Sequence, residues 1–165
     1  MKKRINFTII LFIVLIASFN LNATINDKDN STTWKAGVSR VLITPQQSMW
    51  MAGYAARKRP SEGKETELWA KALALEDTGG NKTVLVTIDN VGTGKYLCDQ
   101  IKEELMKKFN LTKAQIILNF SHTHSGPRLY DPLLNLNMIN EEQVKLMIDY
   151  SEKFKDNIVI LVREA

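Results

Sequence analysis

The sequence predicts an α/β fold, with a mixed sheet that contains one βαβ unit and is flanked by helices. Two apolar runs, residues 68–76 and 83–88, are separated by a short turn sequence and indicate a β-hairpin. The hydrophobic period then changes from two to 3.6 over residues 95–109, and a further apolar run follows at 115–120. A strand, a helix and a strand at this spacing predict parallel pairing through a right-handed crossover.

The first 23 residues have the layout of a secretory signal peptide. Three basic residues, Lys2 to Arg4, precede an apolar stretch at 9–19, and Ala23 follows at a plausible cleavage point. A membrane-spanning helix needs about 20 apolar residues, so a retained anchor is the less favoured alternative. We expect residues 24–33 to form a flexible leader, residues 34–165 to fold, and the protein to be periplasmic, displayed on the cell surface or secreted.

The charge balance and the cysteine content argue against several classes of function. The chain has 22 Lys and Arg against 18 Asp and Glu, and three of these basic residues lie in the predicted signal peptide. The remaining sequence is close to neutral, which gives no support for nucleic-acid binding. Cys98 is the only cysteine, so no internal disulfide can form. Its place on the apolar side of a predicted helix favours a buried thiol over a nucleophile.

The first strand and the loop after it are predicted from residues 34–67. Residues 34–44 hold apolar side chains at Val38, Val41 and Ile43, and Pro45 ends the run. Residues 46–67 have no periodic pattern, and a loop of this length inside a compact domain is usually functional or mobile. We expect its large side chains to anchor the core or the loop rather than to contact a substrate: Trp50, Met51 and Tyr54.

The centre of the fold is predicted from residues 68–120. Residues 68–76 alternate apolar and small side chains as a strand does, residues 77–81 form the hairpin turn, and 83–88 is apolar enough to be a central strand. The apolar run at 115–120 predicts a second buried strand. Between these strands, a helical stripe is spaced every four residues: Leu97, Ile101, Leu105 and Phe109.

The last 25 residues admit two secondary structures. Residues 157–162 have strand propensity, but a helical stripe continues from Val144 to Ala165, and Asn140 followed by two glutamates is a typical helix start. We therefore predict one long helix over 141–165. The chain ends within this apolar run without a helix stop signal, which favours an incomplete, N-terminal part of a larger domain.

His122 and His124, the only histidines of the chain, are the strongest functional signal. They follow the strand at 115–120 and precede Gly126-Pro127, so two imidazoles lie at a strand-to-loop junction. Both could bind one metal ion, or one could bind while the other acts as an acid, a base or a hydrogen-bond donor. The alternative is a polar pair satisfied within the loop.

A catalytic zinc site needs about three protein ligands, so the pair alone is incomplete. Asp89 ends the neighbouring strand, and parallel strands bring their carboxyl ends to one edge of the sheet. It is therefore the best local candidate for a further ligand. We favour two simpler roles over ligation, namely a hydrogen bond to an imidazole or a cap on the turn at residues 92–94.

Several blocks of sequence resemble the N-terminal part of the neutral/alkaline non-lysosomal ceramidase family. The resemblance extends from about Trp34 to Pro127 and is most specific at Ser121-His122-Thr123-His124-Ser125-Gly126-Pro127. The other blocks agree in order and spacing: residues 36–41 with 43–45, Met51-Ala52-Gly53-Tyr54, Leu68-Trp69-Ala70-Lys71-Ala72 and Val86-Thr87-Ile88-Asp89.

The resemblance implies a zinc-dependent amide hydrolase that splits the N-acyl amide of ceramide, or of a related lipid amide, into a sphingoid base and a fatty acid. It implies that His122 is a zinc ligand and that His124 stands beside the metal, where it orients or protonates the reacting group. The family's remaining ligands, a His, a Glu and a Tyr, come from later in the domain. It therefore implies activity for a full-length parent and little or none for these 165 residues alone.

Two other functions stay open at this point. The first is a metal-dependent hydrolase of another amide or ester, because fold and family do not determine the acyl or amine group. The second is a non-catalytic exported domain that binds a lipid or a protein partner. For any lipid substrate we expect at most a peripheral contact with a membrane surface, and no residue pattern predicts an oligomeric state.

Overall fold

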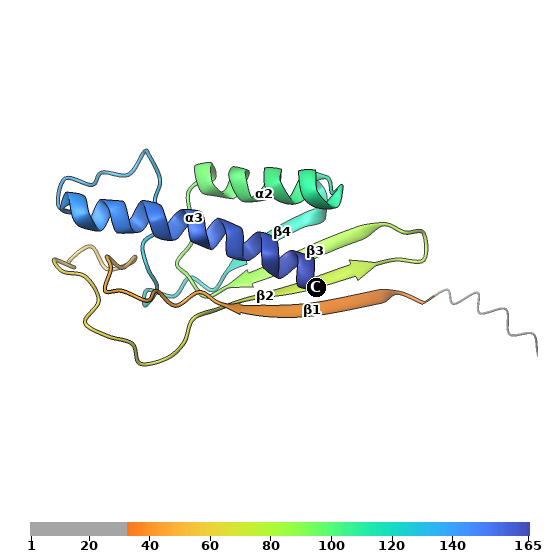
Figure 1. The fold of residues 1–165 in the computed structure, drawn as a ribbon, viewed down its shortest axis with the longest axis horizontal. Helices are drawn as coiled ribbons and strands as arrows, with labels where there is room; N and C mark the ends of the chain where they lie inside the picture. The colour runs from red at the N-terminus through yellow and green to blue at the C-terminus, as the bar shows by residue number, and fades with distance from the viewer. Residues whose placement is uncertain (1–32) are drawn as a thin grey trace, which may run out of the picture. The chain divides into compact units, whose positions relative to one another are not determined.

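The computed structural model describes residues 33–165, so the predicted signal peptide and nearly all of the predicted leader lie outside the described residues. The predicted α/β class is confirmed (Figure 1). Four strands form one mixed sheet, and helices cover one of its faces. In chain order the elements are β1 (Lys35–Leu42), β2 (Trp69–Glu76), β3 (Lys82–Ile88), α2 (Lys95–Phe109), a 3-10 turn (Lys113–Gln115), β4 (Ile116–Phe120) and α3 (Glu141–Glu164).

The first three strands are antiparallel, and their order in the sheet follows the chain. The predicted hairpin between β2 and β3 is present, and Asp77 closes it by accepting hydrogen bonds from the backbone N–H groups of Gly79 and Asn81, each at 2.8 Å. A hydrogen bond from the Asn81 side chain, together with these two backbone bonds, holds the pKa of Asp77 below its usual range. The turn residues from Asp77 to Asn81 therefore set the register of this hairpin.

The predicted βαβ unit is also present, because β4 pairs in parallel with β3 after α2 crosses over. This makes β3 an interior strand, as predicted. The prediction that β4 is buried is wrong, since β4 lies at the edge of the sheet. Ile116 is buried beneath the helices, whereas Ile117 points to the opposite face and keeps 48% of its surface exposed.

Both helices have the apolar stripes that the sequence predicts. Leu97, Ile101 and Leu105 of α2 are buried, and α3 runs unbroken through 157–162, so the strand alternative for that segment is wrong. Asn140 caps α3 by accepting a hydrogen bond from the N–H of Gln143 at 2.8 Å. Cys98 lies half-buried on α2, and burial raises the pKa of its thiol, as expected for an unreactive cysteine.

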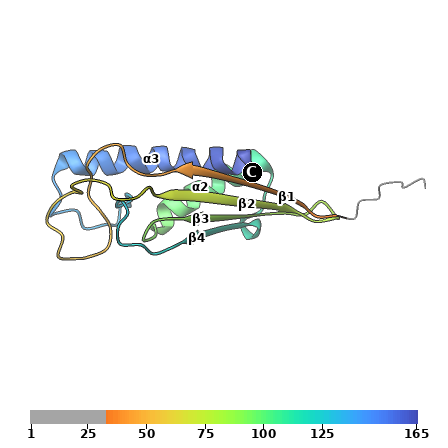
Figure 2. The same cartoon turned by 90° about the horizontal axis from the view of Figure 1, so that it is seen from below.

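The two helices lie on the same side of the sheet (Figure 2). Beneath them, small and branched side chains from β2 and β3 form the core together with Phe154 and Ile158 of α3. The register leaves an apolar row on the other face, one residue from each strand: Val38, Leu73, Leu85 and Ile117. Among residues 33–165, no helix combines the length and apolar character needed to cross a membrane.

Candidate functional site

The two histidines lie just beyond the carboxyl end of β4. The ladder to β3 continues for one further bond, from the N–H of Ser121 to the carbonyl of Ile88 at 3.0 Å. His122 then adopts a left-handed backbone conformation with φ of 59°, which turns the chain away from the sheet. The pair therefore follows the strand, so strand alternation does not bring the two rings together.

The two imidazoles are nevertheless neighbours. Their ring centroids are 5.2 Å apart, with an angle of 63° between the ring planes. The His122 ring is exposed and that of His124 is partly buried. The site thus presents two imidazoles together at one edge of the sheet, which is the arrangement that the sequence predicts although it is reached through a turn.

A hydrogen bond to the backbone holds the His122 ring. Its Nδ1 lies 2.7 Å from the carbonyl oxygen of Val91, which can only accept. Nδ1 therefore carries the proton, and Nε2 of the neutral ring is left with a lone pair. Metal-binding histidines commonly make such a bond through their second nitrogen, since it sets both the tautomer and the direction of the ring.

Asn90 shapes the turn that carries Val91. Its side chain is fully buried, donates from Nδ2 to the carbonyl of Pro127 at 2.9 Å and accepts at Oδ1 from the N–H of Gly92 at 3.2 Å. It thereby joins the end of β3 to the segment after the histidines. Asn90 was not among the residues predicted from the sequence, although its place directly after a predicted central strand was an available signal.

Asp89 does not have either of the roles that were favoured for it. Its Oδ2 accepts a hydrogen bond from the backbone N–H of Trp69 at 3.0 Å, which ties the ends of β2 and β3 together. No hydrogen bond among the described residues joins Asp89 to either histidine, and Asn90 rather than Asp89 closes the turn at 90–92. The carboxylate of Asp89 thus bonds to the backbone of the sheet rather than to the histidine pair.

A segment of the long loop pairs with the chain that follows the histidines. The N–H of Ala52 donates to the carbonyl of Gly126 at 3.0 Å, and the N–H of Arg128 donates to that of Trp50 at 2.8 Å. This antiparallel contact places Tyr54 beside His124, with ring centroids 4.9 Å apart in an edge-to-face arrangement. Of the predicted core or loop anchors, Trp50 is buried, whereas Tyr54 is 63% exposed and packs on His124 within the loop.

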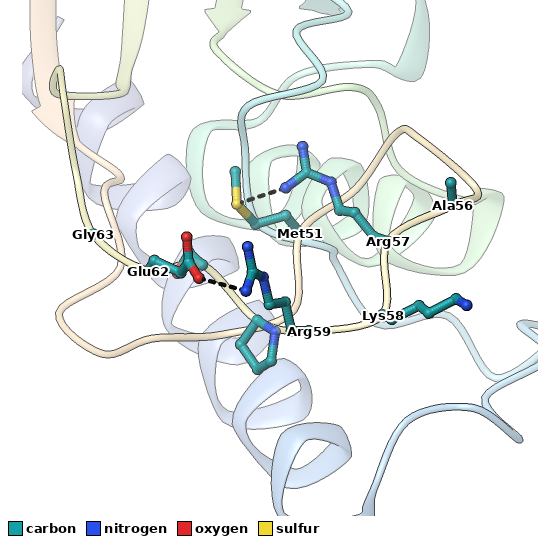
Figure 3. A pocket seen from close by; sticks show the side chains of 9 residues that line it. Met51, Ala56, Arg57, Lys58, Arg59, Glu62 and Gly63 are labelled. Carbon is teal, nitrogen blue, oxygen red and sulfur yellow. Dashed lines mark hydrogen bonds and ion pairs between the residues drawn. The ribbon is translucent and has the colours of Figure 1, made fainter.

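Arg57 reaches the same histidine from the loop. Its Nη2 donates to the carbonyl oxygen of His124 at 2.8 Å, and its Nη1 lies 3.1 Å from the sulfur of Met51. Beside it the loop encloses a cavity of about 580 Å³ that carries the cations Lys58 and Arg59. Figure 3 shows the guanidinium of Arg57 turned toward Met51 and that of Arg59 toward Glu62, while Lys58 extends away from both.

The residues present fit part of a zinc site. The Nε2 lone pair of His122 is available to a metal ion, and imidazole is an ordinary zinc ligand. Within residues 33–165, however, no group of three or more His, Cys, Asp or Glu side chains could hold a metal ion. The roles of His122 as a metal ligand and of His124 as an acid–base group therefore stay predictions.

Comparison with known proteins agrees with the resemblance drawn from the sequence. The family model described as neutral/alkaline non-lysosomal ceramidase, N-terminal, matches residues 34–142. The neutral ceramidases of Drosophila pseudoobscura pseudoobscura and Drosophila melanogaster are 32% and 30% identical to this chain over 100 residues. Each of these alignments covers 59% of this chain and 14% of the relative.

Solved structures share the fold. The neutral ceramidase from Pseudomonas aeruginosa superposes with a TM-score of 0.63 at 22% sequence identity, and a ceramidase complexed with C2 superposes with 0.61 at 22%. Both matches cover 80% of this chain and 21% of the solved chain. The chain thus spans about a fifth of the solved proteins that it matches.

Proposed function

The chain belongs to the neutral/alkaline non-lysosomal ceramidase family, and from this premise we propose that it provides the His122–His124 part of a zinc-dependent amidase site. The substrate is ceramide or a related N-acyl lipid amide, and the products are a sphingoid base and a fatty acid. The single observation that carries the proposal is the pair of adjacent imidazoles, of which His122 is hydrogen-bonded through Nδ1.

The roles of the residues follow from this geometry. The carbonyl of Val91 fixes the tautomer of His122, and we assign Nε2, the ring nitrogen without this bond, as the zinc ligand. A bound Zn²⁺ would supply Lewis-acid polarisation of the amide carbonyl. His124 lies beside that ligand, with a ring that no hydrogen bond among the described residues occupies. We assign it to orient the scissile amide or to pass a proton to the leaving nitrogen.

The activity belongs to a protein in which the site is complete. This chain covers 14% of the curated relatives, and its described residues supply fewer ligands than a catalytic zinc requires. We therefore assign hydrolysis to a protein that adds the remaining ligands, and we propose that it is exported, to the periplasm, the cell surface or the medium.

The test uses a protein of this family that contains this chain and supplies the remaining ligands. That protein is incubated with N-acylsphingosine vesicles, and free fatty acid is measured with and without a zinc chelator. We expect the chelator to abolish release and added Zn²⁺ to restore it. His122→Ala should lose both bound zinc and turnover, while Asn119→Ala, an exposed change on β4, should lose neither.

Three results would contradict the proposal, each in a different part. Fatty-acid release that survives both the chelator and His122→Ala would remove zinc and His122 from the reaction. Release from a simple ester or another acyl amide, with none from N-acylsphingosine, would contradict the proposed substrate and leave the proposed zinc hydrolysis standing. A chain that binds lipid vesicles without any hydrolysis would favour the non-catalytic alternative.

A further inference from the structure

We propose that residues 53–57, here called the positioning loop, hold the His124 imidazole in its working orientation, with Tyr54 and Arg57 as positioning residues. The inference rests on the proposed function in one respect, because it presumes that His124 acts on the substrate. The physical claim, that this loop sets the position of His124, stands on contacts within residues 33–165.

The two histidines are held by different parts of the chain. The His122 ring is bonded to the carbonyl of Val91, on the side of β3. No hydrogen bond among the described residues involves the His124 ring, so its orientation depends on the groups packed against it. One of these is Tyr54, whose ring meets the imidazole at an interplanar angle of 78°. The others are the His122 ring, with its centroid 5.2 Å away, and the backbone of Gly53.

Gly53 allows the loop backbone to lie closer to His124 than a residue with a side chain would without displacement. Its φ is 93°, a conformation that side chains with a Cβ rarely adopt. A Cβ built at this position would lie 2.6 Å from both Cβ and Cγ of His124, well inside van der Waals contact. The loop backbone therefore lies directly against the imidazole, and any larger residue at position 53 must displace one or the other.

Arg57 fixes the loop to the histidine backbone. Its planar guanidinium donates to the carbonyl of His124 while it contacts the sulfur of Met51 and lies 5.5 Å from the centroid of the Tyr54 ring. Among the described residues Arg57 forms no ion pair, and its buried Nε has no hydrogen-bond partner. A buried donor left unpaired costs free energy, which indicates that the other contacts dictate the placement of this side chain.

The chain holds only two histidines, so their ring signals in a histidine-labelled NMR spectrum can be assigned by one substitution each. Tyr54→Leu should remove the ring-current shift on the His124 ring protons, and Tyr54→Phe should preserve it. Arg57→Ala and Gly53→Ala should shift and broaden the His124 signals, with a smaller change at His122. Lys58→Ala, an adjacent exposed cation, is the matched control and should change neither.

The backbone amide spectrum shows whether each variant is folded. Gly53→Ala is the variant most prone to misfold. Tyr54→Leu changes a surface-exposed side chain, so this variant should fold and the test does not depend on Gly53→Ala. The proposal fails if the His124 signals of folded Arg57→Ala and Tyr54→Leu match those of the parent chain. It also fails if both histidines shift equally, since that pattern would indicate a general loosening of the site.

In a protein that completes the site, Arg57→Ala should lower kcat about 10- to 100-fold with a smaller change in KM, because misplacement of a catalytic group acts on the reacting step. Arg57→Lys, with one donor head, should restore only part of this loss, and Tyr54→Phe should retain most of the activity. If the NMR shifts appear but no variant or parent hydrolyses amides, the positioning proposal stands and the proposed function fails. Hydrolysis with unmoved His124 signals would overturn the positioning proposal and leave the proposed function standing.

Discussion

At the scale of single residues, the site depends on side chains that bond to backbone atoms. Val91 offers a carbonyl to His122, and Arg57 donates to the carbonyl of His124. Asn90 supports the first of these contacts, since its buried amide closes the turn that presents Val91. Asp89, the neighbouring carboxylate that the sequence singled out, accepts a hydrogen bond from the backbone of β2 instead. The site is therefore shaped by a buried amide, a guanidinium and backbone carbonyls rather than by the neighbouring carboxylate.

Asn90→Ala should destabilise the chain by about 1–3 kcal/mol, because it leaves the carbonyl of Pro127 without its partner in a buried setting. Urea unfolding of the 165-residue chain measures this loss. The His122 ring signals should shift more than those of His124, the reverse of the positioning-loop variants. Asn119→Ala, the same change on an exposed strand position, is the control, and an equal loss of stability there would refute the specific role of Asn90.

At the scale of elements, strand ends and loop pairing bring the site together. The parallel pairing of β3 and β4 delivers Asn90 and the histidines to one edge of the sheet. The short antiparallel contact between Met51 and Pro127 then brings the long loop to the same place. Two separate blocks of family resemblance, Met51–Tyr54 and Ser121–Pro127, are consequently one structural unit around His124.

Helix α3 packs against β1 and β2 and depends on its start at Asn140. Asn140→Ala should lower the free energy of unfolding by about 1 kcal/mol, since the N–H of Gln143 loses its acceptor. Asn140→Asp should retain most of the stability because a carboxylate also caps a helix. Thermal and urea unfolding measure both, with Asn137→Ala in the preceding exposed segment as the comparison. Equal values for Asn137→Ala and Asn140→Ala would contradict the cap.

At the scale of the whole described unit, the sheet is covered on one face. The buried side chains that β2, β3, α2 and α3 contribute to the main core lie between the strands and the two helices, and the apolar row from Val38 to Ile117 is on the other side. Val38 is 75% exposed in consequence. The sheet that carries the site at its carboxyl end is thus packed against helices on one face only.

Two isoleucine truncations test this asymmetry. Ile158→Ala removes a fully buried side chain of α3 and should cost about 2–5 kcal/mol of stability. Ile117→Ala removes the same atoms from the open face and should cost less than about 1 kcal/mol, because about half of that side chain is already in water. Denaturant unfolding of both variants measures the difference. Similar losses would show that the open face is buried in solution.

The sequence by itself determined the elements and their order. Alternation at 68–76, continuous apolar runs at 83–88 and 115–120, and apolar residues before Pro45 predicted the four strands, and a 3.6-residue period predicted both helices. Asp77 predicted the hairpin, and Asn140 predicted the start of α3. The histidine pair was visible because its chemistry is local to three residues, and the family resemblance drawn from these blocks is confirmed.

The tertiary structure alone decided what surrounds the histidines and which strand is buried. The edge position of β4 depends on the order of strands in the sheet, and Ile117 has the same sequence character whether it is covered or not. Gly53, Tyr54 and Arg57 all contact His124 from a distant part of the chain. Arg57, for example, is 67 residues away from His124 in the sequence. Such contacts arise from packing between distant segments, and no periodicity within either segment encodes them.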